Sequence, residues 1–229
     1  MQKHNDVGSD CPLCGTRARE LARAAGRPLL ACGECALCFV AEPYHVSPEE
    51  ERARYRLHRN TRDNAGYVRM LGTVVTALQR QLPPAREMRV LDYGCGTAEV
   101  LVGLLREAGY AAEGYDPCFR PDTDLARPYE AVVSTETFEH FRRPAEDIAR
   151  VVALVRPGGL LVVMTALHDG VADWGRWHYA LDSTHVVFYA ARTFAWIAAR
   201  WGLRLLQHNA RNLVVLRRPA GTANQPATA

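Results

Sequence analysis

The sequence predicts an α/β protein with a small metal-binding module at its N-terminus. Three observations lead to this fold class. Over residues 87–218, apolar segments that end in acidic or polar residues follow one another, as buried strands do. A Gly-x-Gly turn after the first segment opens a helix, and a Pro-Gly turn precedes a later segment. Two closely spaced cysteine pairs stand near the N-terminus.

Length and composition suit one main domain with a small appendage. The chain has 229 residues, of which 48% are hydrophobic, so it can bury a full core. No apolar run approaches the roughly 18–20 residues of a membrane span, and residues 1–6 lack the pattern of a signal peptide. We therefore expect a cytoplasmic protein without membrane contact.

The N-terminal cysteines predict a structural zinc site. Cys11 and Cys14 form one Cys-x-x-Cys pair and Cys32 and Cys35 form another, with 17 residues between the pairs. This spacing is typical of a zinc ribbon, whose four thiolates close the tetrahedron and leave no position for chemistry. Redox-active thiols are the alternative. Cys38 is expected in the core of the next strand.

Residues 43–86 predict two helices. Ser47 is the expected N-cap of the first, with a proline at the next position and Glu50 completing a capping box. This helix should reach Tyr55. The second should run from about Asp63 to Leu82, where a Pro-Pro pair stops it.

The Gly-x-Gly turn is the most informative motif of the chain. Its glycines let backbone N–H groups approach a ligand, and the helix N-terminus carries partial positive charge. A dinucleotide site would place a third glycine where Glu99 stands, and that carboxylate would repel a pyrophosphate. A ligand without phosphates that carries a sulfonium and an amino-acid tail would not be repelled. Its residues, with the end of the preceding strand, are Asp92, Tyr93, Gly94, Cys95 and Gly96.

Later segments support this interpretation. Asp116, followed by Pro117, stands at the expected end of the second strand, where a carboxylate would hold a ribose diol. Another buried segment ends at Thr135. A helix end and the turn Pro157-Gly158-Gly159 then lead into an apolar strand.

Together these motifs resemble the class I S-adenosylmethionine-dependent methyltransferases over roughly residues 60–218. The resemblance implies a doubly wound, Rossmann-like sheet with S-adenosylmethionine over the strand ends. We then expect a zinc-ribbon module over 1–42, a helical cap or linker over 43–86, the methyltransferase domain over 87–218 and a flexible tail over 219–229. The cofactor-binding residues that the resemblance implies are Asp92, Tyr93, Gly94, Cys95, Gly96, Asp116, Pro117, Thr135 and Glu136.

Segments before the first strand often fold over the cofactor in class I methyltransferases. The resemblance therefore makes His58, Asn60 and Tyr67 candidates for the wall of the pocket. An ordinary junction between two helices is the alternative.

Two segments hold candidate catalytic groups. Glu136 and Glu139 fall on one side of a helical turn, with His140 beside them. His178 and His185 belong to an aromatic-rich segment between later strands, which predicts a substrate lid. In one interpretation, His140 or His185 is a general base for an oxygen, nitrogen or carbon acceptor. The Glu-His pair is then similar to that of the quinone-biosynthesis O-methyltransferases.

In the other interpretation, Glu136, Glu139, His140 and His185 bind a second divalent metal. This pattern resembles the small-RNA 3′-terminal 2′-O-methyltransferases, whose Glu-x-x-Glu-His element and later histidine hold a metal against a terminal diol. Manganese, iron, zinc or magnesium would suit such a donor set. A third alternative is purely structural, with these groups pairing and capping one another.

The whole chain also resembles a group of bacterial zinc-ribbon methyltransferases, on the cysteine pairs and on the segment from His178 to His185. Relatives with a zinc head methylate deoxysugars or ribosomal RNA bases. Residues 1–60 carry nine lysines and arginines against eight acids, which argues against a clamp for RNA phosphates. A small-molecule acceptor is the expectation, RNA is the alternative, and a cofactor-binding module without catalysis is a third.

Overall fold

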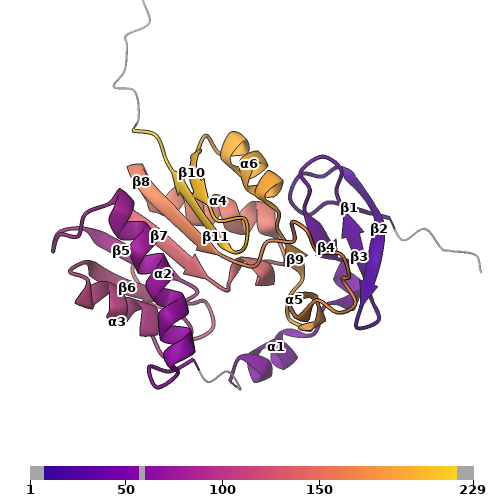
Figure 1. Cartoon of the computed structure of the whole chain (residues 1–229), viewed down its shortest axis with the longest axis horizontal. Coiled ribbons are helices and arrows are strands. Elements are labelled where there is room, and N and C mark those ends of the chain that lie inside the picture. Colours follow the sequence, from indigo (N-terminus) through magenta and orange to yellow (C-terminus); the bar gives the residue numbers. More distant parts are fainter. Residues whose placement is uncertain (1–7, 57–59, 221–229) are drawn as a thin grey trace, which may run out of the picture.

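The computed structural model describes residues 8–56 and 60–220, which form two β-sheets with helices packed around the larger one (Figure 1). The larger sheet has six strands in the order β10-β11-β8-β7-β5-β6. Strands β6, β5, β7 and β8 are parallel, β11 is antiparallel to β8, and β10 is antiparallel to β11. The strands are β5 (Arg89–Tyr93), β6 (Ala111–Tyr115), β7 (Tyr129–Thr135), β8 (Val155–Met164), β10 (Arg204–His208) and β11 (Leu213–Arg217).

Helices cover both faces of this sheet. Successive strand residues point to opposite faces, so Val90 joins the core under α2 and α3, while Leu91 joins the core under α4 and α6. The predicted doubly wound α/β fold is therefore confirmed. Between β6 and β7, residues 116–128 add neither a helix nor a strand beyond one isolated bridge. The four helices are α2 (Ala65–Gln81), α3 (Val100–Glu107), α4 (Pro144–Leu154) and α6 (Ala191–Arg200).

The smaller sheet combines N-terminal strands with a late segment of the chain. Its order is β1-β2-β3-β4-β9, and β9 (Val187–Phe188) pairs antiparallel with β4 through Cys38↔Phe188 and Phe39↔Val187. Residues of the N-terminal module thus form one continuous sheet with residues that follow β8. The other strands are β1 (Ser9–Asp10), β2 (Arg17–Ala24), β3 (Arg27–Ala31) and β4 (Cys38–Val40).

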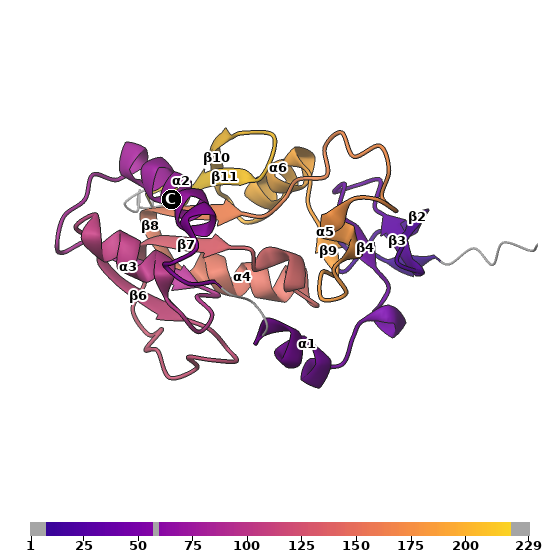
Figure 2. The ribbon, with the colours of Figure 1, turned by 60° about the horizontal axis from the view of Figure 1, so that its bottom comes forward.

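The two α-helices that precede β5 begin close to where the sequence predicts. Helix α1 (Pro48–Tyr55) has Ser47 as its N-cap, and Glu50 completes the capping box. Helix α2 begins at Ala65 and not at Asp63, because the Asn64 side chain accepts a hydrogen bond from Tyr67 N and caps it there. Both views place α1 between the two sheets (Figures 1 and 2).

Short elements complete the described chain: η1 (Glu42–Tyr44), η2 (Phe138–His140) and α5 (His178–Leu181). His58 and nearly all of the predicted flexible tail lie outside the described residues. Among the helices that are described, none has both the length and the apolar composition needed to cross a membrane.

Candidate active site

A cavity of about 720 Å³ lies at the carboxyl ends of β5, β6 and β7. The chain leaves β5 for β6 on one side and β7 lies on the other, so the cavity occupies the topological switch point where α/β folds bind ligands. Asn60 and Tyr67 also line it, so the segment before the first strand does form part of the wall. The predicted site residues that line it are Tyr93, Gly94, Cys95, Gly96, Asp116, Pro117, Thr135, Glu136, Glu139, His140 and His185.

The glycine turn needs glycine for two different reasons. Gly94 and Gly96 both have left-handed backbone angles, with φ of +87° and +62°. A Cβ on Gly94 would also clash with the Thr137 side chain, whereas a Cβ on Gly96 would meet open space. Gly94 N and Cys95 N both donate to Tyr115 O, at 2.8 and 3.1 Å, which ties the turn to the end of β6.

Glu99, in the third glycine's place, is also left-handed, with φ of +46°, and it is the N-cap of α3. Its carboxylate forms an ion pair with Arg120 from the loop after β6. The position therefore keeps the backbone conformation in which glycine would be unstrained, but it presents a negative charge instead.

Asp116 organises the loop after β6. Its Oδ2 accepts from Gly96 N at 3.1 Å, and its Oδ1 accepts from Cys118 N at 2.8 Å and from Phe119 N at 3.1 Å. The carboxylate thus fixes the glycine turn while lining the cavity. If Asp116 held a ribose, its carboxylate would bind the ribose and the backbone of the glycine turn at the same time.

Asp92 lies beneath the cavity and does not line it. The side chain is 2% exposed, and its Oδ1 has no hydrogen-bond partner among the described residues. Burial, with Asp116 and Glu99 nearby, raises the pKa of Asp92 to about 8. Such a group of acidic side chains fits a cationic ligand, because a positive charge above the turn would stabilise the carboxylates of Asp116 and Glu99 and would favour ionisation of Asp92.

The acceptor side of the cavity centres on a buried carboxylate. Glu139 is fully buried, and its Oε2 accepts from Thr165 Oγ1 at 2.9 Å, while Thr165 Oγ1 lies 3.0 Å from Tyr179 Oη. Its Oε1 has no hydrogen-bond partner among the described residues. Burial raises the pKa of Glu139 to about 7.

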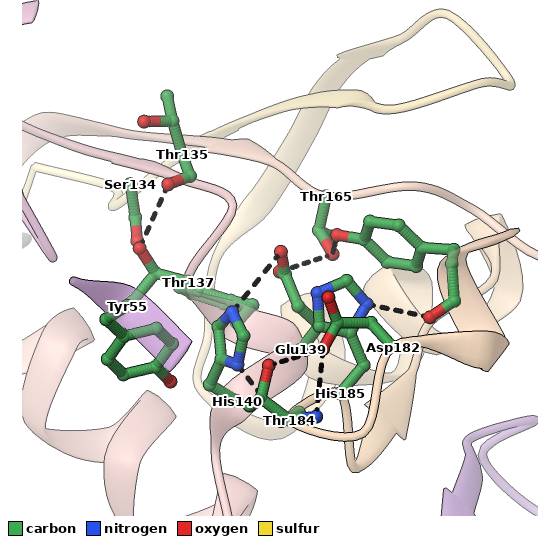
Figure 3. Close-up of polar contacts among 12 residues, drawn as sticks. Tyr55, Ser134, Thr135, Thr137, Glu139, His140, Thr165, Asp182, Thr184 and His185 are labelled. Carbon is green, nitrogen blue, oxygen red and sulfur yellow. Dashed lines mark hydrogen bonds and ion pairs between the residues drawn. The ribbon is translucent and has the colours of Figure 1, made fainter. Parts of the chain in front are cut away.

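Two imidazoles lie next to this carboxylate (Figure 3). His140 Nδ1 lies 3.0 Å from Thr184 O, and His185 Nδ1 lies 2.8 Å from Tyr179 O. A carbonyl only accepts, so each Nδ1 carries the proton and donates. Burial lowers the pKa of both histidines, that of His185 to about 3, so both rings are neutral and each Nε2 keeps a free lone pair.

The cluster contains three of the four predicted metal ligands. Ligand atoms of Glu139, His140 and His185 lie within 4.8 Å of one another, and His140 Nε2 is 4.0 Å from Glu139 Oε1. Glu136 lines the cavity outside this group, because it leaves β7 in a left-handed turn with φ of +49°. His178 is exposed at the start of α5 and does not line the cavity, so the structure does not bring it to the site.

No local pattern identified the side chains that α1 contributes to the wall of the cavity. Tyr55 meets the His140 ring edge-on, with centroids 5.2 Å apart, and Glu51 pairs with Arg142 at 2.9 Å. These contacts join residues about 90 positions apart through tertiary packing, whereas local patterns report only on near neighbours. Thr165 and Tyr179, which orient Glu139, were missed for the same reason.

The four predicted cysteine ligands lie together in the N-terminal module. The sulfurs of Cys11 and Cys35 are 3.6 Å apart and those of Cys14 and Cys32 are 3.3 Å apart, far longer than a disulfide bond. Four sulfurs at tetrahedral positions about zinc would be roughly 3.8 Å apart, so the group fits this ion. Cys38 lies outside the group, buried in β4 as predicted.

Comparisons with known proteins agree with this geometry. Residues 66–208 match the family described as "Methyltransferase domain". An O-methyltransferase family protein from Burkholderia thailandensis superposes with a TM-score of 0.52 and 19% identity over 75% of this chain and 64% of that one. A chain from a complex containing the Haloferax volcanii Trm112 methyltransferase activator gives 0.50 and 13% identity, over 74% of this chain and 98% of that one. None of the curated proteins matches the chain.

Proposed function

Since the chain belongs to the methyltransferase-domain family, we propose that it transfers a methyl group from S-adenosylmethionine to a small-molecule acceptor. One observation carries the proposal: an acidic glycine turn and a pair of neutral imidazoles line the same cavity. The turn suits a cationic methyl donor, and the imidazoles suit an acceptor that must lose a proton. The chain spans 64% of the length of the Burkholderia protein.

The cofactor half of the site follows from the glycine turn. When bound, S-adenosylmethionine supplies an electrophilic methyl group on a sulfonium, and its leaving group needs no acid. The protein's task is then chiefly to hold the methyl group in line with the acceptor. In this proposal Asp116 binds the ribose, the backbone of Gly94–Gly96 holds the amino-acid end, and the buried carboxyl of Asp92 lies beneath them.

On the acceptor half, Glu139, His140 and His185 would hold a second divalent metal. Glu139 Oε1 has no hydrogen-bond donor among the described residues, and it lies beside the Nε2 lone pairs of His140 and His185. A positive charge between these three atoms would stabilise them, and a metal ion would supply it. A two-histidine, one-carboxylate set leaves coordination positions open and suits iron, manganese or zinc. Such an ion would lower the pKa of an acceptor hydroxyl group. Without metal, the same lone pairs would serve as general base.

A small acceptor is favoured over RNA by the charges that line the cavity. Of the three arginines that line the cavity, Arg142 pairs with Glu51, and Arg150 pairs with Asp147 at 3.0 Å. Two of the three cations are thus already compensated, whereas binding an RNA backbone requires several cations that are free to pair with phosphates.

In the N-terminal module, Cys11, Cys14, Cys32 and Cys35 would bind a structural zinc. The geometry of their sulfurs supports this assignment. Since all four positions would be filled by thiolates, this ion would stabilise the module and take no part in methyl transfer.

Calorimetry with S-adenosylhomocysteine, followed by transfer of labelled methyl groups from S-adenosylmethionine to a panel of hydroxylated small molecules and to total RNA, tests the proposal. We expect cofactor binding and labelling of a small acceptor. Binding without any labelling would favour the non-catalytic module, labelled RNA would favour the alternative acceptor, and the absence of cofactor binding would refute the proposal.

A further inference from the structure

A buried arginine of the N-terminal module grips the segment that carries His185. Arg27 is the first residue of β3 and is 8% exposed. Its Nη1 donates to Ser183 O at 2.9 Å and to His185 O at 3.1 Å. Its Nη2 donates to Ala180 O at 2.8 Å and to Asp182 O at 2.7 Å. One guanidinium thus binds four carbonyls within six residues.

The same segment sets the orientation of both imidazoles. Tyr179 O accepts from His185 Nδ1, and Thr184 O accepts from His140 Nδ1. Of the seven carbonyls from 179 to 185, four accept from Arg27 and two accept from the histidine rings. The segment therefore lies between a cation of the N-terminal module on one side and the imidazole pair on the other.

We infer that Arg27 is a positioning residue of the acceptor site. It touches neither cofactor nor acceptor, but it holds the segment whose carbonyls Tyr179 O and Thr184 O keep each Nδ1 protonated and each Nε2 free. These two carbonyls lie one shell behind the ligating atoms, and groups in that shell commonly change metal affinity about 10–100-fold when they are lost. Arg27 acts through them. The inference rests on the proposed function in assigning those two lone pairs to the acceptor site.

A second set of contacts runs from the module to the same cluster. Val40 N donates to Val186 O at 2.8 Å, and Val186 N donates to Glu139 O at 2.8 Å. The pairing of β4 with β9 continues directly from this contact. The backbone of Glu139 is therefore also fixed to the module, so all three groups of the cluster depend on it.

Lysine cannot reproduce the grip of Arg27. The guanidinium is planar and presents two Nη groups in a fixed fork, each here shared by two carbonyls, whereas an ammonium is a compact group with three donors. Arg27→Lys keeps the charge near Asp182 and loses the fork, so it separates geometry from charge. Arg19→Lys is a matched control, because Arg19 lies on neighbouring β2 with its side chain exposed.

The test compares these two variants with the wild-type protein. Two-bond ¹H–¹⁵N spectra report which nitrogen of each imidazole carries the proton. We expect Arg27→Lys to mix the tautomers of His140 and His185 and to weaken Mn²⁺ binding at least about tenfold, with affinity for S-adenosylhomocysteine within about twofold of wild type. Arg19→Lys should change none of these. Unchanged tautomers in Arg27→Lys would overturn the inference.

The two proposals fail in different ways. If wild-type protein binds no Mn²⁺ and transfers no methyl group, the proposed function fails, but a tautomer change in Arg27→Lys still supports positioning. If Arg27→Lys does not fold, Arg27→Gln, whose amide can donate to part of the same set of carbonyls, replaces it. In the wild-type protein the Arg27 Nη protons should exchange slowly and show cross-peaks to residues 180–185. Fast exchange would refute the contact itself.

Discussion

The rings of His140 and His185 meet edge to face with centroids 4.8 Å apart, and each donates its Nδ1 proton to a carbonyl of one short segment. Neither nitrogen that faces the cluster carries a proton. Two protonated rings at this distance would repel each other, and burial opposes charging either one. The pair therefore offers two neutral Nε2 lone pairs beside the Glu139 carboxylate.

Metal binding should depend on His140 and His185 and not on the nearby His178. In protein with the cysteine site filled, titrated Mn²⁺ should bind once per chain, and His140→Ala or His185→Ala should remove that binding because each takes away one of three ligands. Calorimetry or electron paramagnetic resonance measures it. His178→Ala is the control, since His178 is exposed outside the cavity. Binding that survives both alanine variants would favour the metal-free site.

Asp92→Asn should be more stable than the wild type in the cofactor-free state, by a margin that grows as pH rises. The folded pKa of Asp92 is raised to about 8 from 3.8, so between these values the folded state holds a proton that the unfolded state releases. Wild-type stability therefore falls with rising pH across this window, and the asparagine variant lacks this loss. Its advantage should grow by at most about 1.4 kcal/mol for each pH unit across this window.

Melting temperatures of the two proteins from pH 4 to 8 measure this difference, because contributions from histidines are common to both and cancel. Asp122→Asn, an exposed site near the same loop, should run parallel to the wild type. Parallel curves for Asp92→Asn would show that its carboxyl is not perturbed. The same variant should bind S-adenosylhomocysteine more weakly.

Gly94→Ala should be more damaging than Gly96→Ala. Both glycines have positive φ, so alanine is strained by roughly 1 kcal/mol at either position. Only at Gly94 does the new methyl group also clash with Thr137, which would displace η2 and its acidic residue Glu139. Thermal unfolding and calorimetry with S-adenosylhomocysteine check the order. Equal losses would mean that the contact with Thr137 yields without cost.

Cys11→Ser should release the zinc and destabilise the N-terminal module. Elemental analysis of wild-type protein should find about one zinc per chain, because four thiolates bind a single ion. Cys38→Ala is the control: Cys38 is buried in β4 outside the group, so this variant should lose stability but keep its zinc. A stable, zinc-free wild type would refute the ribbon.

Asp116→Ala should weaken binding of S-adenosylhomocysteine at least about tenfold, because it removes the proposed ribose ligand and frees the Gly96 N–H that it holds. Calorimetry measures the affinity. The exposed Asp122→Ala serves as control for a lost charge in the same loop. Unchanged affinity in Asp116→Ala would remove this residue from the cofactor site.

Local signals predicted the parts of the structure that local physics determines. The capping box at Ser47 and Glu50 sets the start of α1 through contacts three residues apart. The glycine turn and the acids at the ends of β5 and β6 follow from strand-to-helix geometry. The spacing of the two cysteine pairs likewise predicted that the four sulfurs lie together.

The parts that were missed depend on contacts between distant segments. His178 and His185 belong to one segment, yet only His185 reaches the cavity. Arg27 donates to the His185 carbonyl, and Tyr179 O accepts from the His185 ring. Glu136 and Glu139 looked equivalent at i, i+3, but η2 is a short 3₁₀ turn preceded by a left-handed residue, and only Glu139 joins the group with the two histidines. Nothing local to either segment specifies these outcomes.

The pairing of β4 with β9 has a consequence for synthesis of the chain. Strand β4 leaves the ribosome about 150 residues before the strand that completes its sheet, so its backbone donors and acceptors stay unpaired on that edge while the larger domain is being made. The N-terminal module can gather its cysteines early, but its last strand arrives only after β8. The nascent protein is therefore most exposed to edge-to-edge association during that interval, and the arrival of residues 187–188 ends it.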